Sequence, residues 1–156
     1  MLRLMIVCAA LVAFIGITSA EAPAQPATRA EARMERVEGI GRFFFRSSSP
    51  KTLAQWYSDH LGVTLTPPDY DHEPWQQGAG PTVFEPFPAD SEYFGRADRT
   101  FMLNFRVRDL DAMVAQLRRA GIAVEVDPQT YPNGRFARLS DPEGNPIQLW
   151  QPRKKA

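Results

Sequence analysis

The chain has 156 residues and carries 18 Lys and Arg side chains against 18 Asp and Glu, so its formal net charge is zero. This length suits one domain, and the balanced charge excludes the basic surface that nucleic-acid-binding proteins usually need. The single cysteine, Cys8, lies in an N-terminal apolar stretch. If that stretch is removed after export, the mature chain has no thiol. This excludes disulfides, cysteine nucleophiles and cysteine metal ligands.

Residues 1–20 have the pattern of a signal peptide. Arg3 supplies a positive charge, residues 4–17 are mostly apolar, and residues 18–20 (Thr-Ser-Ala) offer small side chains for cleavage. We therefore expect export, either to the periplasm or out of the cell, with no stable membrane insertion after cleavage. The alternative is an uncleaved N-terminal anchor, although the apolar stretch is short for a membrane span.

One ordered domain is expected at residues 37–152. It follows a flexible leader at residues 21–36, which is rich in Ala, Pro, Glu and Arg, and it precedes a basic tail at residues 153–156. In its first half, β-branched and aromatic residues in short runs predict strands. These strands are expected at residues 40–47, 63–66 and 82–86.

A helix is predicted between the first two of these strands. Ser49 precedes Pro50, which favours an N-cap followed by the first helical position, and Gly62 is typical of a helix C-terminus. The side chains expected on the packed face recur at helical spacing. They are Leu53, Trp56, Tyr57, His60 and Leu61.

The second half predicts the same order of elements. A strand at residues 100–108 leads to Asp109, which favours a helix N-cap, and Gly121 is expected to end the helix. A short strand follows at residues 122–126. Residues 136–150 then predict a β-hairpin. The apolar stripe expected on the helix consists of Leu110, Met113, Val114 and Leu117.

The turn of this hairpin is the sequence Asp-Pro-Glu-Gly-Asn at residues 141–145. Pro142 fixes its own φ, Gly144 supplies a positive φ, and Asn145 tolerates the left-handed conformation. These residue types predict a tight turn between two strands.

The two halves repeat the same strand and helix pattern. In the leading strands, Phe45 and Arg46 correspond to Phe105 and Arg106. Such a repeat implies two modules, about residues 37–87 and 100–152, that close a shared core because one amphipathic unit cannot bury its own face.

The chain resembles the glyoxalase / bleomycin-resistance / extradiol dioxygenase superfamily, also called vicinal oxygen chelate (VOC) proteins. Residues 43–50, 53–57 and 61–62 carry the resemblance in the first half, and residues 103–111 and 141–150 carry it in the second. The resemblance implies an α+β fold, in which two βαβββ modules curl their sheets into a cup-shaped half barrel around a small-molecule site. Relatives often pair, so it also admits a homodimer.

Metal-binding relatives place His, Glu or Gln ligands at four points. The resemblance carries these points to Arg42, Met102, Gln148 and Val83, with Glu85 as the alternative to Val83. A guanidinium has no acceptor atom, a thioether suits soft metals, and one amide cannot assemble a site. We therefore expect no metal and no other cofactor. This expectation argues against lactoylglutathione lyase and extradiol dioxygenase activity.

If the four points face the cup, strand alternation brings the residues two and four positions along to the same side. A small planar or acidic ligand is predicted there, because Arg42 matches carboxylate or phosphate oxygens and rings flank it. The expected ligand-binding residues are Arg42, Phe44, Met102, Asn104, Gln148 and Trp150, with Trp75 as a loop lid or anchor. The residues expected to pack against the helices are Phe43, Phe45, Leu103, Phe105, Ile147 and Leu149.

Three functions fit this sequence, and we rank them in the following order. The first is an exported protein that binds a small molecule without a metal. The second is a metal-independent lyase or isomerase, with Glu85 as general base and Arg42 or Asn104 stabilising developing charge. The third is a degenerate structural domain that acts through a dimer surface. Arg46 and Arg106 are expected to form structural salt bridges.

Overall fold

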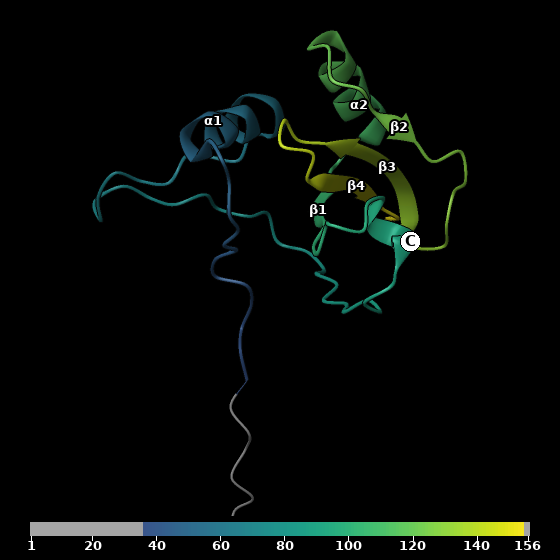
Figure 1. The fold of residues 1–156 in the computed structure, drawn as a ribbon, viewed down its shortest axis with the longest axis horizontal. Coiled ribbons are helices and arrows are strands. Elements are labelled where there is room, and N and C mark those ends of the chain that lie inside the picture. Colours follow the sequence, from purple (N-terminus) through teal and green to yellow (C-terminus); the bar gives the residue numbers. More distant parts are fainter. Residues whose placement is uncertain (1–35, 155–156) are drawn as a thin grey trace, which may run out of the picture. The chain divides into compact units, whose positions relative to one another are not determined.

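The computed structural model describes residues 36–154. The predicted signal peptide, nearly all of the leader and the end of the tail lie outside the described residues. Neither α-helix in the described part has the length and apolar composition needed to span a bilayer. The elements, in chain order, are α1 (Pro50–Leu61), the 3-10 helix η1 (Glu92–Phe94), β1 (Leu103–Arg106), α2 (Leu110–Arg119), β2 (Glu125–Val126), β3 (Gly134–Ser140) and β4 (Pro146–Pro152) (Figure 1).

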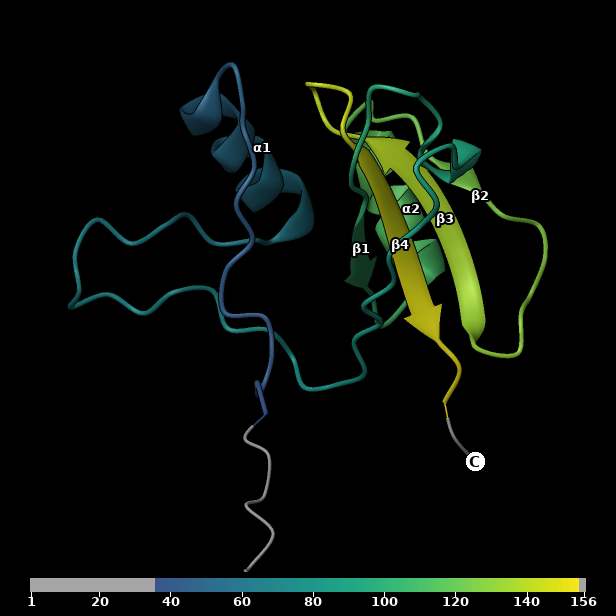
Figure 2. The same ribbon diagram turned by 60° about the horizontal axis from the view of Figure 1, so that its bottom comes forward.

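The second half forms one βαβββ module. Its four strands make a sheet in the order β1-β4-β3-β2, in which β1 runs parallel to β4 and the other pairs are antiparallel. The long strands β3 and β4 curl together, and the sheet stays open (Figure 2). The predicted α+β class is therefore confirmed, and β1 lies at one edge of the sheet.

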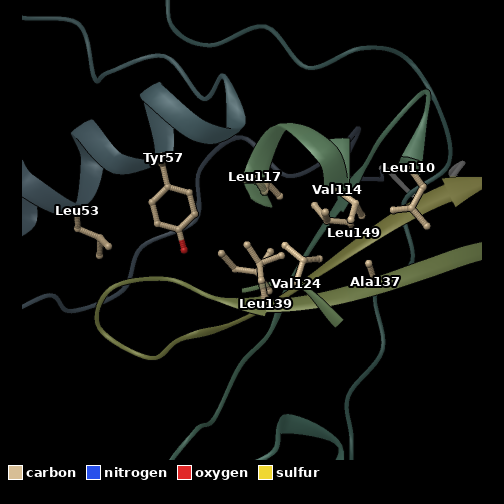
Figure 3. Close-up of a cluster of buried hydrophobic side chains, with 10 residues drawn as sticks. Leu53, Tyr57, Leu110, Val114, Leu117, Val124, Ala137, Leu139 and Leu149 are labelled. Atoms are coloured by element: carbon tan, nitrogen blue, oxygen red, sulfur yellow. The ribbon is translucent and has the colours of Figure 1, made fainter. Parts of the chain in front are cut away.

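The core lies between this sheet and α2. Ile147 and Leu149 of β4, with Ala137 of β3, are fully buried, and they alternate with residues on the opposite sheet face. Leu110 and Leu117 of α2 cover them (Figure 3). Leu53 and Tyr57 of α1 belong to the same cluster. This arrangement confirms the prediction that the odd-numbered residues of β4 pack against the helices.

Both helices begin and end near their predicted positions. Pro50 is the first residue of α1, and Gly62 closes it with a left-handed φ of 69°. In α2, the Asp109 side chain accepts a hydrogen bond from the Ala112 backbone N–H at 3.0 Å. Ser49 is the N-cap residue of α1, as predicted, but its side chain makes no cap hydrogen bond.

A distant carboxylate takes over the capping of α1. Glu143, in the β3–β4 turn, accepts hydrogen bonds from the hydroxyls of Ser47 and Ser48 at 2.9 and 2.8 Å. It also accepts from the backbone N–H groups of Ser48 and Ser49 at 3.2 and 3.0 Å. An anion at a helix N-terminus is stabilised by the unpaired N–H groups and by the helix dipole.

The same turn makes a second, buried contact with α1. Asp141 is 5% exposed, and its carboxylate accepts a hydrogen bond from the Tyr57 hydroxyl at 2.9 Å. The backbone N–H groups of Glu143 and Asn145 also donate to Asp141, each at 2.9 Å. Burial, together with the charge of Asp141, holds the pKa of Tyr57 above its ordinary value, so the phenol stays a donor.

The turn itself follows the predicted design with one difference. Gly144 has a φ of 75°, as its role required. Asn145 does not use the left-handed conformation, because within residues 36–154 only glycines have a positive φ. Its side-chain amide donates instead to Asp141 at 2.7 Å.

The predicted strands of the first half are not formed. Residues 40–47, 63–66 and 82–86 are extended or irregular and pair with no strand in the described part of the chain. Their residue composition favours strands, but a strand also needs a neighbour for its backbone hydrogen bonds. The predicted strands at residues 100–108 and 122–126 are shorter than expected for the same reason, since only the paired residues form a ladder.

Replacing Tyr57 with Phe should destabilise the protein. The substitution keeps the ring in the core and removes one of the donors to the buried Asp141 carboxylate. We expect the free energy of unfolding to fall by about 1–3 kcal/mol in urea denaturation. Tyr70→Phe is the matched control, because Tyr70 is fully exposed and should tolerate the change. Equal stability of the Tyr57 variant and the unmodified protein would contradict this role for the hydrogen bond.

Glu143 should make stability depend on pH. Hydrogen bonds from Ser48 and Ser47 lower its pKa in the folded protein. A lowered folded pKa means that the stabilisation is present above the unfolded pKa, whose ordinary value is 4.5, and is lost as the pH falls through the folded pKa. Glu143→Gln should therefore lower the urea midpoint at pH 7, and the gap should narrow at and below about pH 4.

The matched control for this experiment is Glu125→Gln. Glu125 is exposed on β2, and its side chain makes no hydrogen bond within residues 36–154. Its replacement should leave the pH profile of the urea midpoint unchanged. A constant gap between Glu143→Gln and the unmodified protein across this pH range would show that the carboxylate charge is not the stabilising element.

Candidate functional site

The sheet face opposite α2 carries two cross-strand rows of side chains. The register places Asn104 beside Gln148 and Gln148 beside Arg138. Two residues further along these strands, the register places Arg106, Trp150 and Phe136 side by side in a second row. We call these six residues the polar sheet face. They lie together because each strand turns alternate residues to the same side.

A chain of hydrogen bonds crosses the first row. The Asn104 amide donates to Gln148 Oε1 at 2.7 Å. Gln148 is 7% exposed, and its own amide donates to the Tyr93 hydroxyl at 2.9 Å. Gln148 therefore uses both ends of its amide group inside the protein, and the three side chains hold one another in place.

Tyr93 brings the connection between the two halves over this face. The Arg138 guanidinium lies over the Tyr93 ring, with its central carbon 4.2 Å from the ring centroid. Arg138 also donates to the Tyr93 backbone carbonyl at 3.1 Å. On the other side, Phe87 stacks with Tyr93 at 4.9 Å between ring centroids. These contacts fix the direction of the phenol.

Trp150 lies in the second row, and its side chain is almost fully buried. Its indole N–H donates to the Asn133 carbonyl at 3.0 Å, and its ring stacks with Phe136 at an interplanar angle of 10°. Gly134 lies so close to the Trp150 indole and to the Gln151 carbonyl that a Cβ would collide with them. The site thus places an ordered aromatic pair beside the polar row.

Arg106 occupies the second row and has no acidic partner among residues 36–154. Its guanidinium donates to the Gly78 carbonyl at 2.7 Å and leaves no room for a Cβ on Gly80. The expectation of structural salt bridges at Arg46 and Arg106 was wrong, because neither side chain forms an ion pair within the part of the chain that the structure describes.

The structure brings together only part of the predicted site. Asn104, Gln148 and Trp150 share the polar sheet face, and Met102 directly precedes β1 with the same side-chain alternation. Arg42 and Phe44 are exposed, and no hydrogen bond or ring contact joins them to this face among residues 36–154.

Phe43 and Phe45, the two neighbours of Phe44, lie together as strand alternation predicts. They contact a residue other than the predicted helix residues. Phe43 and Phe45 contact the Phe101 ring at 5.3 and 5.4 Å between centroids. Phe44 is 81% exposed and makes no ring contact within residues 36–154. The helices were expected to receive Phe43 and Phe45, and Phe101 receives them instead.

Trp75 lies apart from the polar sheet face. Its ring contacts Phe105 at 6.3 Å between centroids, and Phe105 belongs to the side of β1 that packs with Tyr57. This contact anchors the long loop to the core side of the sheet, which is one of the two roles predicted for Trp75. The candidate general base Glu85 is exposed and makes no side-chain hydrogen bond in the described part of the chain.

The residues present do not fit the metal site of metal-binding relatives. Within residues 36–154, no three His, Cys, Asp or Glu side chains gather closely enough to hold a metal ion. At the four equivalent points, the side chains are a guanidinium, a thioether, an isopropyl group and an amide. The amide oxygen of Gln148 already accepts a hydrogen bond from Asn104. No step through a metal follows from this donor set.

Sequence reasoning missed three members of the site: Tyr93 as a hydrogen-bond partner, Phe136 and Arg138. A signal for two of them was present in the hairpin. A five-residue turn at 141–145 pairs Ser140 with Pro146, and counting outward from it places Arg138 beside Gln148. Tyr93 approaches from a distant segment, and no local pattern indicates that contact.

The comparisons with known proteins agree with this architecture. Residues 42–150 match the model of the glyoxalase-like domain. This match covers more than half of the chain, so the protein belongs to the glyoxalase-like domain family and to the VOC superfamily. No curated protein matches the chain.

Among solved structures, the chain is similar to TnmS3, an antibiotic-binding protein from Streptomyces sp. CB03234. The identity is 27%, the match covers 77% of this chain and 100% of TnmS3, and the TM-score is 0.52. A glyoxalase/bleomycin resistance protein from the same organism is 47% identical over 31% of this chain and 42% of its own, with a TM-score of 0.29. A glyoxalase family protein from Bacillus anthracis is 16% identical over 72% and 99%, with a TM-score of 0.44.

Proposed function

We propose that this protein binds a small organic molecule, without a metal ion, on the polar sheet face. The observation that carries the proposal is the bonded chain of Asn104, Gln148 and Tyr93. At the position where relatives carry a metal ligand, this chain has Gln148, and both ends of its amide group are hydrogen-bonded inside the protein. The exposed ends of the chain are polar groups of fixed direction beside aromatic rings, which is the usual composition of a small-molecule site.

The likeness to TnmS3 supports the same function. That protein binds an antibiotic, and its whole length matches this chain. An aromatic antibiotic or a comparable planar compound suits a face that carries Tyr93, Phe136 and Trp150. We keep export as part of the proposal, because a binding protein outside the cytoplasm would meet such compounds first. The signal peptide at residues 1–20 remains a prediction.

The two other functions receive less support. A general base must reach its substrate and usually needs a shielded setting that tunes its protonation. Glu85 is exposed and lies in an irregular segment outside the sheet. A pocket filled by Arg42, Met102 and Trp150 would favour the structural-domain hypothesis, but Arg42 is exposed.

A thermal-shift screen of aromatic acids and aromatic antibiotics should find ligands whose affinity is unchanged by EDTA. Gln148→Leu should weaken these ligands by about 10-fold, because it removes both hydrogen bonds that fix Asn104 and Tyr93. Isothermal titration calorimetry measures the change.

Gln129→Leu is the matched control for this substitution, because Gln129 is an exposed loop glutamine whose side chain makes no hydrogen bond within residues 36–154. It should bind the same ligands as the unmodified protein. Stoichiometric zinc, iron, manganese or nickel in the purified protein would contradict metal-free binding. Equal affinities of the Gln148 variant and the unmodified protein would show that the ligands bind elsewhere on the protein.

We further propose that the protein forms a homodimer. Phe44 is 81% exposed and Phe84 is 85% exposed, and both lie in extended segments without a strand partner in the described part of the chain. The edge of β1 also has no neighbour in the sheet that residues 36–154 form. Exposed apolar segments and open strand edges favour association with another chain, and a second copy offers the matching edge and segments.

Light scattering after size exclusion should therefore give about twice the mass of the monomer. Phe44→Lys should shift the protein toward the monomer, since it places a charge in the exposed apolar segment. Tyr70→Lys, at an exposed loop aromatic, is the control and should leave the mass unchanged. Mass action favours the dimer as the concentration rises, so a monomeric mass that persists when the protein is concentrated about 100-fold would contradict the proposal.

A further inference from the structure

The proton of the Tyr93 hydroxyl has no acceptor among the residues that the structure describes. Its oxygen accepts the hydrogen bond from the Gln148 amide at 2.9 Å, so that contact does not use the phenol's own hydrogen. Among residues 36–154, no side chain or backbone oxygen accepts from this hydroxyl. Tyr93 is 38% exposed, so part of its side chain is open to a molecule that arrives at the sheet face.

Arg138 brings a positive charge to the same ring. One of its nitrogens donates to the Tyr93 carbonyl, and a guanidinium has five N–H groups in all. No carboxylate in the described part of the chain lies within ion-pair distance of Arg138. Glu125 of β2 is paired with Arg138 in the sheet, but their side chains form no ion pair within residues 36–154. The Asp127 carboxylate, which follows β2, accepts from the Tyr131 hydroxyl at 2.9 Å.

Arg135, three residues earlier on the same strand, shows the contrast. It faces α2 and forms a two-pronged ion pair with Asp111, with distances of 2.8 and 2.9 Å. The charge on that side of β3 is therefore neutralised within the protein. On the polar sheet face, Arg138 and Arg106 donate to backbone carbonyls, and neither forms an ion pair with a carboxylate among residues 36–154.

The geometry points to an anion-binding subsite at Tyr93 and Arg138, which receives the acidic oxygen of an aromatic ligand. The inference rests on the proposed function and adds the residues that select the charge of the ligand. A phenol hydroxyl and a guanidinium are both donors, and a carboxylate or phenolate oxygen accepts from both. The stacking of Arg138 on Tyr93 and of Tyr93 on Phe87 fixes the two donors before the ligand binds, which reduces the entropy lost on binding.

A pair of probes that differ only in charge tests the subsite. 2-Naphthoate and 2-naphthamide share a ring system, and only the first is an anion at pH 7. We expect the unmodified protein to prefer the naphthoate by about 10-fold in NMR titrations. Tyr93→Phe, which keeps the ring and removes the hydroxyl, and Arg138→Gln should each remove most of this preference. In each variant the affinity for the amide should fall less than the affinity for the naphthoate, because the amide has no charge for the subsite to select.

Arg135→Gln is the matched control, because it removes a charge from the same strand on the side facing α2. It should keep the preference for the naphthoate. Equal binding of the two probes by the unmodified protein would overturn the subsite and leave the proposed function standing. Binding of neither probe would overturn both. If Arg138→Gln fails to fold by circular dichroism, the Tyr93 variant decides, and an unchanged preference in it would overturn the inference.

Discussion

Two carboxylates in the β3–β4 turn connect the helix of the first half to the sheet of the second. Asp141 is buried and accepts from the Tyr57 hydroxyl, from two backbone N–H groups and from the Asn145 amide. A buried charge is tolerated only when it is hydrogen-bonded in this way. Glu143 meanwhile caps α1 by accepting from the Ser49 backbone N–H, and it also accepts from the hydroxyls of Ser47 and Ser48. The turn conformation and the position of α1 therefore depend on each other, and the same turn sets the register that brings Gln148 beside Arg138.

The sequence predicts whatever is decided by near neighbours. The starts and ends of both helices, the tight turn at Gly144 and the alternation along β4 follow from residue types a few positions apart. Pairing between distant segments does not follow from such signals. Residues 82–86 have strand composition and no ladder, and the cap of α1 comes from Glu143, far along the chain. The contact of Tyr93 with Gln148 also joins two distant segments, and no sequence pattern near either residue predicts it.

The polar sheet face is held in one arrangement before any ligand arrives. Asn104, Gln148 and Tyr93 are linked in series, Arg106 is tied to the Gly78 carbonyl, and the Trp150 indole is tied to Asn133. A side chain that is already fixed loses little conformational entropy when it binds. This arrangement suits recognition of a rigid planar molecule, because each donor and each ring keeps its direction.

The chemistry of these side chains also bears on the choice between binding and turnover. Side-chain amides neither gain nor lose a proton near neutral pH, and a guanidinium group keeps its proton in proteins. Asn104, Gln148, Arg106 and Arg138 can therefore take part in hydrogen bonds, but their chemistry does not suit the role of a general base. General base catalysis needs an acceptor within hydrogen-bond reach of the reacting atom. The one carboxylate that sequence reasoning offered for that role, Glu85, is exposed in an irregular segment. This position gives no support to Glu85 as the general base of a lyase or isomerase.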